Sequence, residues 1–267
     1  MKKTQKKKNF EPVPKPSQKP ATKQSTKPIK LKATRETRAI AAASEQLSLI
    51  EDKSLPKAPR RKLFVAMAGN IGAGKTTAAK MVSQKFGFEL FDEPVIDNRF
   101  LKNYYGDMKR WSFTLQLEFL IKRVQHHELI HRVPKSCIQD RTLYEDPEIF
   151  AKYLHGLGNM TDSELELYFD YFKRLTKTVA QPDKVICFDV PKVDVLLSRI
   201  KVRGREEEKG IQSDFLRGLN GYYATFPMVL AGKYGIDVLT LDVTNLDIRT
   251  GQGRAEFLDE VSSFLTK

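Results

Sequence analysis

The sequence predicts an α/β domain in which helices cover both faces of a parallel sheet. From residue 61 onward, apolar runs of strand length alternate with longer helical stretches. A glycine-rich loop of the phosphate-binding kind joins the first of these runs to the first helix. Because strands that alternate with helices are joined by crossovers, the strands are expected to be parallel and buried.

The glycine-rich loop fits the phosphate-binding pattern G-x-x-x-x-G-K-[ST]. It consists of Gly69, Asn70, Ile71, Gly72, Ala73, Gly74, Lys75 and Thr76, followed by Thr77 as a further phosphate-binding position. The run at 63–68 before it has the composition of a buried strand. Backbone N–H groups of such a loop point at phosphate oxygens, and the helix N-terminus adds partial positive charge. Lys75 is therefore predicted to reach the β- and γ-phosphates, and Thr76 to hold Mg²⁺.

The net positive charge of the chain is confined to its N-terminal part. The 267 residues carry a net charge of +13, and residues 1–62, with 18 Lys and Arg against 5 Asp and Glu, account for all of it. Residues 63–267 balance at 28 charges of each sign, which gives no indication of a nucleic-acid-binding surface. Residues 1–60 also hold seven of the thirteen prolines. We therefore predict a disordered basic extension at 1–60 and one folded domain at 61–267.

Three interpretations of the basic extension remain open. We favour a solvated run of charge; the others are a tether to nucleic acid or another polyanion, and an organelle-targeting peptide. No apolar run approaches the roughly 18 residues of a membrane span, so no membrane contact is expected. Cys137 and Cys187 lie in apolar runs, which suits reduced thiols and predicts a cytoplasmic protein.

Strands and helices can be placed along the folded part. Strands are predicted at 63–68, 88–91, 136–140, 184–189 and 236–241. Helices are predicted from residue 77 and at 110–131, 147–155, 162–180, 193–202 and 254–265. The long helix at 110–131 is expected to present one apolar face, formed by Phe113, Leu117, Leu120, Ile121 and Val124.

Acidic residues follow three predicted strands, at the edge of the sheet where ligands of open α/β folds bind. Glu93 is either a base for an attacking hydroxyl or simply the strand-ending residue before Pro94. Asp140 adjoins Arg141, and together they could assist Mg²⁺ and offset charge that develops on a phosphate. Asp189 competes for the same role, but we favour Asp140 because of the neighbouring arginine.

Polar residues on and after the long helix suggest a site for a nucleobase. Gln116 and Arg123 lie seven residues apart and so share a face, although ordinary surface placement fits the sequence as well. Asp146 stands before a proline and is suited to cap a helix, while the same carboxylate could also pair with an arginine. His127 and His131 have the spacing of a metal pair, but without a third ligand nearby we interpret both as surface residues.

Three arginines stand close together at the end of a predicted helix. Arg199 and Arg203 are four residues apart, and Gly204 provides a hinge before Arg205. A segment of this kind can close over transferring phosphates and exclude water. Solvated helix charge is the alternative, and three arginines within seven residues argue against it.

Together these motifs resemble those of the deoxynucleoside kinase family, across 61–267 and not across 1–60. The matching stretches are the phosphate loop, 93–95 (EPV), 110–116 (RWSFTLQ), 140–146 (DRTLYED) and 199–205 (RIKVRGR). The stretch 139–161 looks most like bacterial deoxyadenosine kinases. The resemblance implies a P-loop kinase with a five-stranded parallel sheet, helices on both faces and an arginine-bearing lid.

The resemblance also implies roles at matching positions. The base on the 5′-hydroxyl would be Glu93, supported by Arg141. The residues that would read the nucleobase are Gln116, Arg123 and Asp146, between apolar walls formed by Leu101, Leu115 and Phe150. The 3′-hydroxyl would be held by Tyr105 and Glu208. The lid arginines would be Arg199, Arg203 and Arg205. The segment 242–248 would pass the adenine of ATP.

Two positions depart from the family pattern. Many members have a glutamate where this chain has Asp140, although the bacterial subgroup accepts aspartate. Asn98 stands where animal relatives often carry a bulky aromatic side chain over the sugar and base. The second difference affects the shape of the pocket for the nucleobase.

The resemblance implies an enzyme that uses ATP and Mg²⁺ to phosphorylate the 5′-hydroxyl of deoxynucleosides in nucleotide salvage. We expect deoxyadenosine as the main substrate, deoxyguanosine or deoxycytidine as further ones, and a homodimer as the assembly. The enzymatic alternative is a nucleoside monophosphate kinase such as thymidylate kinase. The alternative of another class is a P-loop regulator associated with nucleic acid. The balanced charge of 63–267 disfavours it, and so does the lack of the guanine-recognition motif N-K-x-D.

Removal of residues 1–60 is expected to leave kcat and KM almost unchanged, because composition and charge separate this segment from the predicted domain. Adsorption to polyanions should fall and lose its salt dependence. Steady-state kinetics and heparin retention of the full chain and the truncated chain test this. A large loss of activity in a truncated chain that still folds would place the extension in the active unit.

Overall fold

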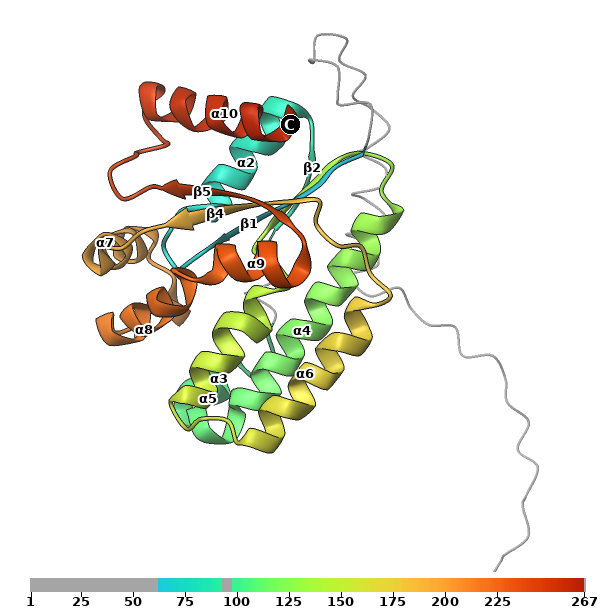
Figure 1. Cartoon of the computed structure of the whole chain (residues 1–267). Coiled ribbons are helices and arrows are strands. Elements are labelled where there is room, and N and C mark those ends of the chain that lie inside the picture. The colour runs from blue at the N-terminus through green and yellow to red at the C-terminus, as the bar shows by residue number, and fades with distance from the viewer. Residues whose placement is uncertain (1–61, 93–97, 267) are drawn as a thin grey trace, which may run out of the picture. The chain divides into compact units, whose positions relative to one another are not determined.

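A five-stranded parallel sheet forms the centre of the computed structural model, which describes residues 62–92 and 98–266 (Figure 1). The strand order is β2-β3-β1-β4-β5, and every neighbouring pair is parallel. The strands are β1 (Phe64–Gly69), β2 (Glu89–Phe91), β3 (Cys137–Asp140), β4 (Lys184–Asp189) and β5 (Asp237–Asp242). All five predicted strands are thus confirmed within a residue or two at each end.

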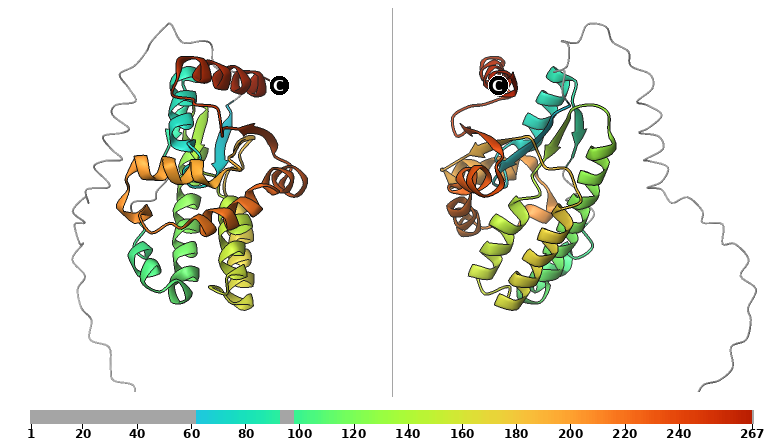
Figure 2. Two further views of the ribbon diagram at one scale, coloured as in Figure 1. Left: turned by 90° about the vertical axis from the view of Figure 1, so that its left-hand side faces the viewer. Right: turned by 45° about the vertical axis from the view of Figure 1, so that its right-hand side comes forward.

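Helices cover both faces of this sheet, as the sequence predicted (Figures 1 and 2). On one side lie α2 (Lys75–Phe86) and α10 (Gly251–Thr266); on the other lie α4 (Met108–Arg132), α6 (Asp162–Thr176) and α9 (Phe226–Tyr234). The remaining helices are α3 (Leu101–Gly106), a π-helical turn (Asp146–Ala151), α5 (Lys152–Gly156), α7 (Val193–Arg203), a 3₁₀ turn (Glu206–Glu208) and α8 (Ser213–Tyr223). None of the described helices is long and apolar enough to cross a membrane.

Alternate residues of the central strand enter two separate hydrophobic cores, as the pleat of a strand requires. Phe64 and Ala66 of β1 pack with residues of α4, α6 and α9. Val65 and Met67 pack on the opposite face with residues of α2 and α10. All of β1 is buried, so this strand anchors the loop that follows it. Cys137 and Cys187 are buried in β3 and β4 and are not disulfide-bonded.

Three helices, α3, α8 and α9, were not predicted. Their sequences carry glycine or proline, which usually disfavour helices, and two of these residues have a clear structural reason. A Cβ atom at Gly218 of α8 would lie 2.3 Å from the Tyr153 hydroxyl, so glycine permits close packing against α5. Pro227 stands in the first turn of α9, where a missing N–H costs nothing. Helix α6 ends at Thr176 instead of residue 180.

Helix α4 forms where it was predicted, but the interpretation of its faces was partly wrong. Leu120 and Val124 are buried, whereas Ile121 is 44% exposed. Polar side chains occupy much of the buried face instead, namely Ser112, Gln116, Glu118, Arg123 and His127. A long helix whose inner face is so polar must meet polar partners, because an unpaired buried polar group is costly.

The interpretation of His127 as a surface residue was wrong, whereas His131 is exposed as expected. The imidazole of His127 is fully buried, with Nδ1 2.7 Å from the Ala180 carbonyl oxygen and Nε2 2.9 Å from Oε1 of Gln139. The Phe64 ring packs against it edge-on. Burial lowers the pKa of His127 to about 4, because the charged form loses its hydration.

The buried imidazole predicts a pH dependence of stability. An unfolded histidine has a pKa of about 6.5, so the unfolded chain binds the extra proton first, and stability falls as the pH drops from 6.5 towards 4. Between pH 7.5 and 5.0 this group should cost about 2 kcal/mol. Urea unfolding at both pH values, in wild type and His127→Gln, measures it. An equal pH effect in both proteins would contradict a neutral buried histidine.

Candidate active site

The phosphate loop joins the carboxyl end of β1 to the N-terminus of α2. Gly72 and Gly74 adopt φ angles of +83° and +101°, a region that disfavours other residues. A Cβ atom at Gly72 would lie 2.8 Å from the carbonyl oxygen of Leu196, so this glycine lets α7 approach the loop. The site therefore lies at the carboxyl edge of the sheet, beside its central strand, where open α/β folds bind ligands.

The side chains that follow the loop are held close to it. The Lys75 ammonium donates to the carbonyl oxygens of Gly69, at 2.8 Å, and Asn70, at 3.1 Å. The Thr76 hydroxyl donates to Oδ2 of Asp140, at 2.5 Å. The predicted pair Thr76 and Asp140 is thus brought together, whereas the competing Asp189 is exposed at the end of β4.

The donor set around Thr76 and Asp140 fits Mg²⁺. Both side chains offer oxygen, which this cation prefers, and Asp140 is buried at the end of β3. Within the described ranges, no group of three or more His, Cys, Asp and Glu side chains could hold a metal ion. One carboxylate and one hydroxyl are sufficient for Mg²⁺, because it usually completes its shell with phosphate oxygens and water.

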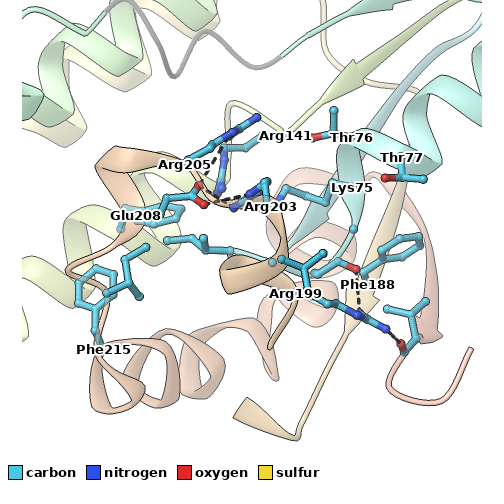
Figure 3. A pocket seen from close by; sticks show the side chains of 18 of the residues that line it. Lys75, Thr76, Thr77, Arg141, Phe188, Arg199, Arg203, Arg205, Glu208 and Phe215 are labelled. Carbon is cyan, nitrogen blue, oxygen red and sulfur yellow. Dashed lines mark hydrogen bonds and ion pairs between the residues drawn. The ribbon is translucent and has the colours of Figure 1, made fainter. Parts of the chain in front are cut away.

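One pocket of about 480 Å³ contains most of the predicted site residues (Figure 3). Those that line it are Ile71, Gly72, Ala73, Gly74, Lys75, Thr76, Thr77, Leu101, Tyr105, Leu115, Gln116, Arg123, Arg141, Asp146, Phe150, Arg199, Arg203, Arg205 and Glu208. Val243 and 246–249, from the segment after β5, line it as well. Gly69, Asn70 and Asp140 are not among the residues that line it. Glu93, the predicted base, falls outside the described residues.

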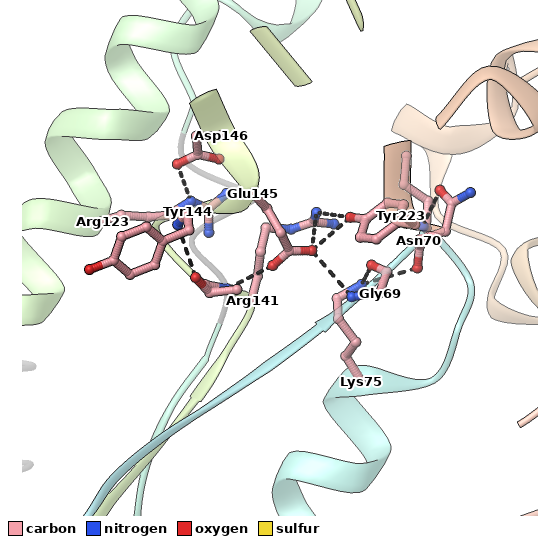
Figure 4. Close-up of polar contacts among 11 residues, drawn as sticks. Gly69, Asn70, Lys75, Arg123, Arg141, Tyr144, Glu145, Asp146 and Tyr223 are labelled. Carbon is pink, nitrogen blue, oxygen red and sulfur yellow. Dashed lines mark hydrogen bonds and ion pairs between the residues drawn. The ribbon is translucent and has the colours of Figure 1, made fainter. Parts of the chain in front are cut away.

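The inner part of the pocket carries a buried ion pair. Nε of Arg123 lies 2.6 Å from Oδ2 of Asp146, and both side chains are almost inaccessible (Figure 4). Oε1 of Gln116, also buried in the pocket wall, has no hydrogen-bond partner among the described residues. Surface placement of Gln116 and Arg123, the alternative left open by the sequence, is therefore wrong.

Asp146 does not cap a helix, contrary to the capping interpretation. It is the first residue of the π-helical turn, and its carboxylate faces Arg123 of α4. Burial raises the pKa of Asp146 to about 6, although Arg123 acts in the opposite direction. This π-helical turn contributes Asp146 and Phe150 to the pocket wall, and π-helical turns are frequent at functional sites.

The three lid arginines contact protein groups in this structure (Figure 3). Arg203 forms two hydrogen bonds with the Glu208 carboxylate, at 2.6 and 2.9 Å, and Arg205 lies 3.6 Å from the same group. Arg199 instead donates to the carbonyl oxygens of Ala73 and Val243. Gly204, with a φ of +68°, ends α7 between the arginines and allows the turn.

Glu145, a fully buried acid directly before Asp146, was not predicted from the sequence. Its carboxylate accepts hydrogen bonds from the backbone N–H of Gly69 and from the Tyr223 hydroxyl, among others (Figure 4). Gly69 and Tyr223 lie 76 and 78 residues away in the sequence, so local sequence could not reveal these two contacts. The one local indication was the position of Glu145 directly before Asp146, in the stretch after β3.

Known proteins resemble this chain over nearly all of the described part. The family model "Deoxynucleoside kinase" matches residues 65–266. A deoxyadenosine kinase of Dictyostelium discoideum is 36% identical over 61% of this chain and 65% of its own length. A deoxyadenosine/deoxycytidine kinase of Bacillus subtilis is 29% identical over 76% of this chain and 93% of its own length.

A solved structure agrees with these sequence matches. Deoxyadenosine kinase from M. mycoides with bound dATP has a TM-score of 0.66 and 30% sequence identity, covering 75% of this chain and all of that one. The five-stranded parallel sheet, the phosphate loop and the pocket beside it agree with the fold of a P-loop kinase. The chain belongs to the deoxynucleoside kinase family and is a kinase.

Proposed function

We propose that this kinase transfers the γ-phosphoryl group of ATP to the 5′-hydroxyl of deoxynucleosides, with deoxyadenosine preferred. The observation that carries the proposal is that the buried pair of Arg123 and Asp146 lines the same pocket as Lys75 and Thr76. A nucleobase held at the pair and phosphates held at the loop would bring donor and acceptor together. Such positioning accounts for much of phosphoryl-transfer catalysis.

The proposed chemistry gives each of the predicted catalytic and phosphate-binding residues one role. Glu93 takes the proton of the 5′-hydroxyl, and Arg141 offsets the charge that develops on the transferred group. Lys75 binds the β- and γ-phosphates. Thr76 and Asp140 would hold Mg²⁺, which, when bound, neutralises phosphate charge. The lid arginines Arg199, Arg203 and Arg205 and the segment 242–248 complete the ATP site in this proposal.

The buried pair supports selection of the nucleobase. A guanidinium only donates hydrogen bonds and a carboxylate only accepts them. Arg123 can therefore donate to a ring nitrogen, while Asp146 accepts from an exocyclic amino group. Adenine and cytosine present this pattern, whereas thymine presents a carbonyl, a ring N–H and a methyl group. Gln116 adds the acceptor Oε1, and the apolar walls come from Leu101, Leu115 and Phe150.

The sugar would be held from the lid side of the pocket. Tyr105 and Glu208 both line it and are the proposed partners of the 3′-hydroxyl. Glu208 pairs with Arg203 in this structure. When the sugar binds, its 3′-hydroxyl would replace Arg203 as a partner of the Glu208 carboxylate. That exchange would make Arg203 available to a phosphate, linking acceptor binding to the lid.

We also propose a cytoplasmic homodimer. The buried, unpaired thiols of Cys137 and Cys187 suit a reducing compartment. Helices α4 and α6 pack together and carry exposed apolar side chains that a second subunit could cover. These side chains are Ile121 and Leu129 on α4 and Leu167 and Tyr171 on α6.

A panel of acceptors tests the proposed function. With ATP and Mg²⁺, the full chain should phosphorylate deoxyadenosine, more slowly deoxyguanosine or deoxycytidine, and thymidine least. The four deoxynucleosides and their 5′-monophosphates are assayed side by side for kcat/KM. Turnover of monophosphates alone would identify a nucleoside monophosphate kinase and overturn the proposal.

The buried pair predicts a non-additive mutant cycle. Arg123→Met or Asp146→Ala alone should lower kcat/KM for deoxyadenosine roughly 10²–10³-fold, because the remaining charge is buried without its partner. The double variant should lose much less than the product of the two and should gain thymidine activity. Glu118→Gln, which breaks the ion pair with Arg99 outside the pocket, is the control. Independent losses with no gain on thymidine would show that the two residues do not act as a pair.

A further inference from the structure

The carboxylate of Glu145 joins three parts of the chain (Figure 4). Oε1 accepts from the N–H of Gly69 at 3.2 Å and from the hydroxyl of Tyr223 at 2.6 Å. Oε2 accepts from the N–H of Thr142 at 2.7 Å, and the Arg141 guanidinium lies 3.4 Å from Oε1. One side chain thus contacts the start of the phosphate loop, the turn after β3 and helix α8.

Arg141 needs such support, because its backbone is strained. Its φ of +74° is the only positive value among the non-glycine residues that the structure describes. Conformations of this kind persist only where the surroundings enforce them. Glu145 binds the N–H of Thr142 directly after the strained residue and also contacts the guanidinium. Nη1 of Arg141 donates to the Tyr223 hydroxyl at 3.2 Å, and the guanidinium lies over the Phe150 ring.

A second buried glutamate, three residues further along, offers a comparison. Glu148 also accepts a hydrogen bond from a tyrosine hydroxyl, that of Tyr234, and pairs with Lys152 and Lys233. None of these four residues lines the active-site pocket. Glu145 and Glu148 are therefore both buried and both accept from a tyrosine hydroxyl. Among the contacts of these two side chains within the described residues, only those of Glu145 reach a pocket residue, Arg141, and the phosphate loop.

We propose that Glu145 and Tyr223 are positioning residues for phosphoryl transfer. Neither side chain lines the active-site pocket, so both would act through Arg141 and Gly69. They hold the guanidinium and the first N–H of the phosphate loop at a fixed separation. Arg141 can then meet charge that develops on the transferred group without first reorganising. This inference rests on the proposed function, because the effect is assigned to the transfer step.

Two matched pairs of full-length variants test the inference. Tyr223→Phe and Glu145→Gln alter the Glu145 site, and Tyr234→Phe and Glu148→Gln make the same changes at Glu148. Thermal stability, kcat and the KM values for ATP and deoxyadenosine are measured for all four. The first pair should lower kcat roughly 10–100-fold, as expected for a misplaced catalytic group. KM for deoxyadenosine should stay within about threefold, because the nucleobase contacts are unchanged.

The control pair should lose stability to a similar extent but keep kcat within about threefold of wild type. Equal effects of the two pairs on kcat would mean that Glu145 only stabilises the fold, and the inference would be overturned. Should Glu145→Gln fail to fold, the comparison of Tyr223→Phe with Tyr234→Phe decides whether Glu145 and Tyr223 affect kcat. Each of these two variants removes one hydroxyl and preserves the shape of the side chain. A wild-type chain that phosphorylates no deoxynucleoside would refute the proposed function, which is a distinct outcome.

Discussion

The arrangement of the site depends on hydrogen bonds to one buried carboxylate, that of Glu145. A carboxylate only accepts hydrogen bonds, so its burial is tolerable only while donors surround it. Here the donors come from the end of β1, from the turn after β3 and from α8. Movement of any of the three segments would leave the acid poorly paired, at a cost of several kcal/mol. The carboxylate thus ties the phosphate loop to Arg141.

The next residue, Asp146, faces the other way. Glu145 points towards the phosphate loop and Asp146 towards Arg123 on α4 (Figure 4). Two adjacent acids therefore have partners in two different parts of the site. The π-helical turn begins at Asp146, and this local change of helical geometry also brings Phe150 to the pocket wall. The position of Asp146 is therefore fixed relative to the phosphate loop by a single short segment.

Much of this architecture could be predicted from local sequence. Apolar runs located the five strands, and the glycine pattern located the loop, because both depend on near neighbours in the chain. The contacts of Glu145 with Gly69 and Tyr223 and the burial of His127 could not be predicted, since they arise from contacts between distant segments. Helices α8 and α9 were missed because they contain glycine and proline. Gly218 allows close packing against Tyr153, and Pro227 stands in the first turn of α9, where no N–H is needed. Glu93 and the basic extension lie outside the described residues, so their predicted roles stay predictions.

The most direct test of the central role of Glu145 is the exchange rate of the Gly69 amide hydrogen, followed by NMR. Its bond to Oε1 should protect this amide in wild type, and Glu145→Ala should speed its exchange roughly tenfold or more, as expected on loss of a buried hydrogen bond. Glu148→Ala, the control, should leave the rate nearly unchanged. Unaltered exchange in Glu145→Ala, or equal acceleration in both variants, would contradict the account that Glu145 holds the phosphate loop.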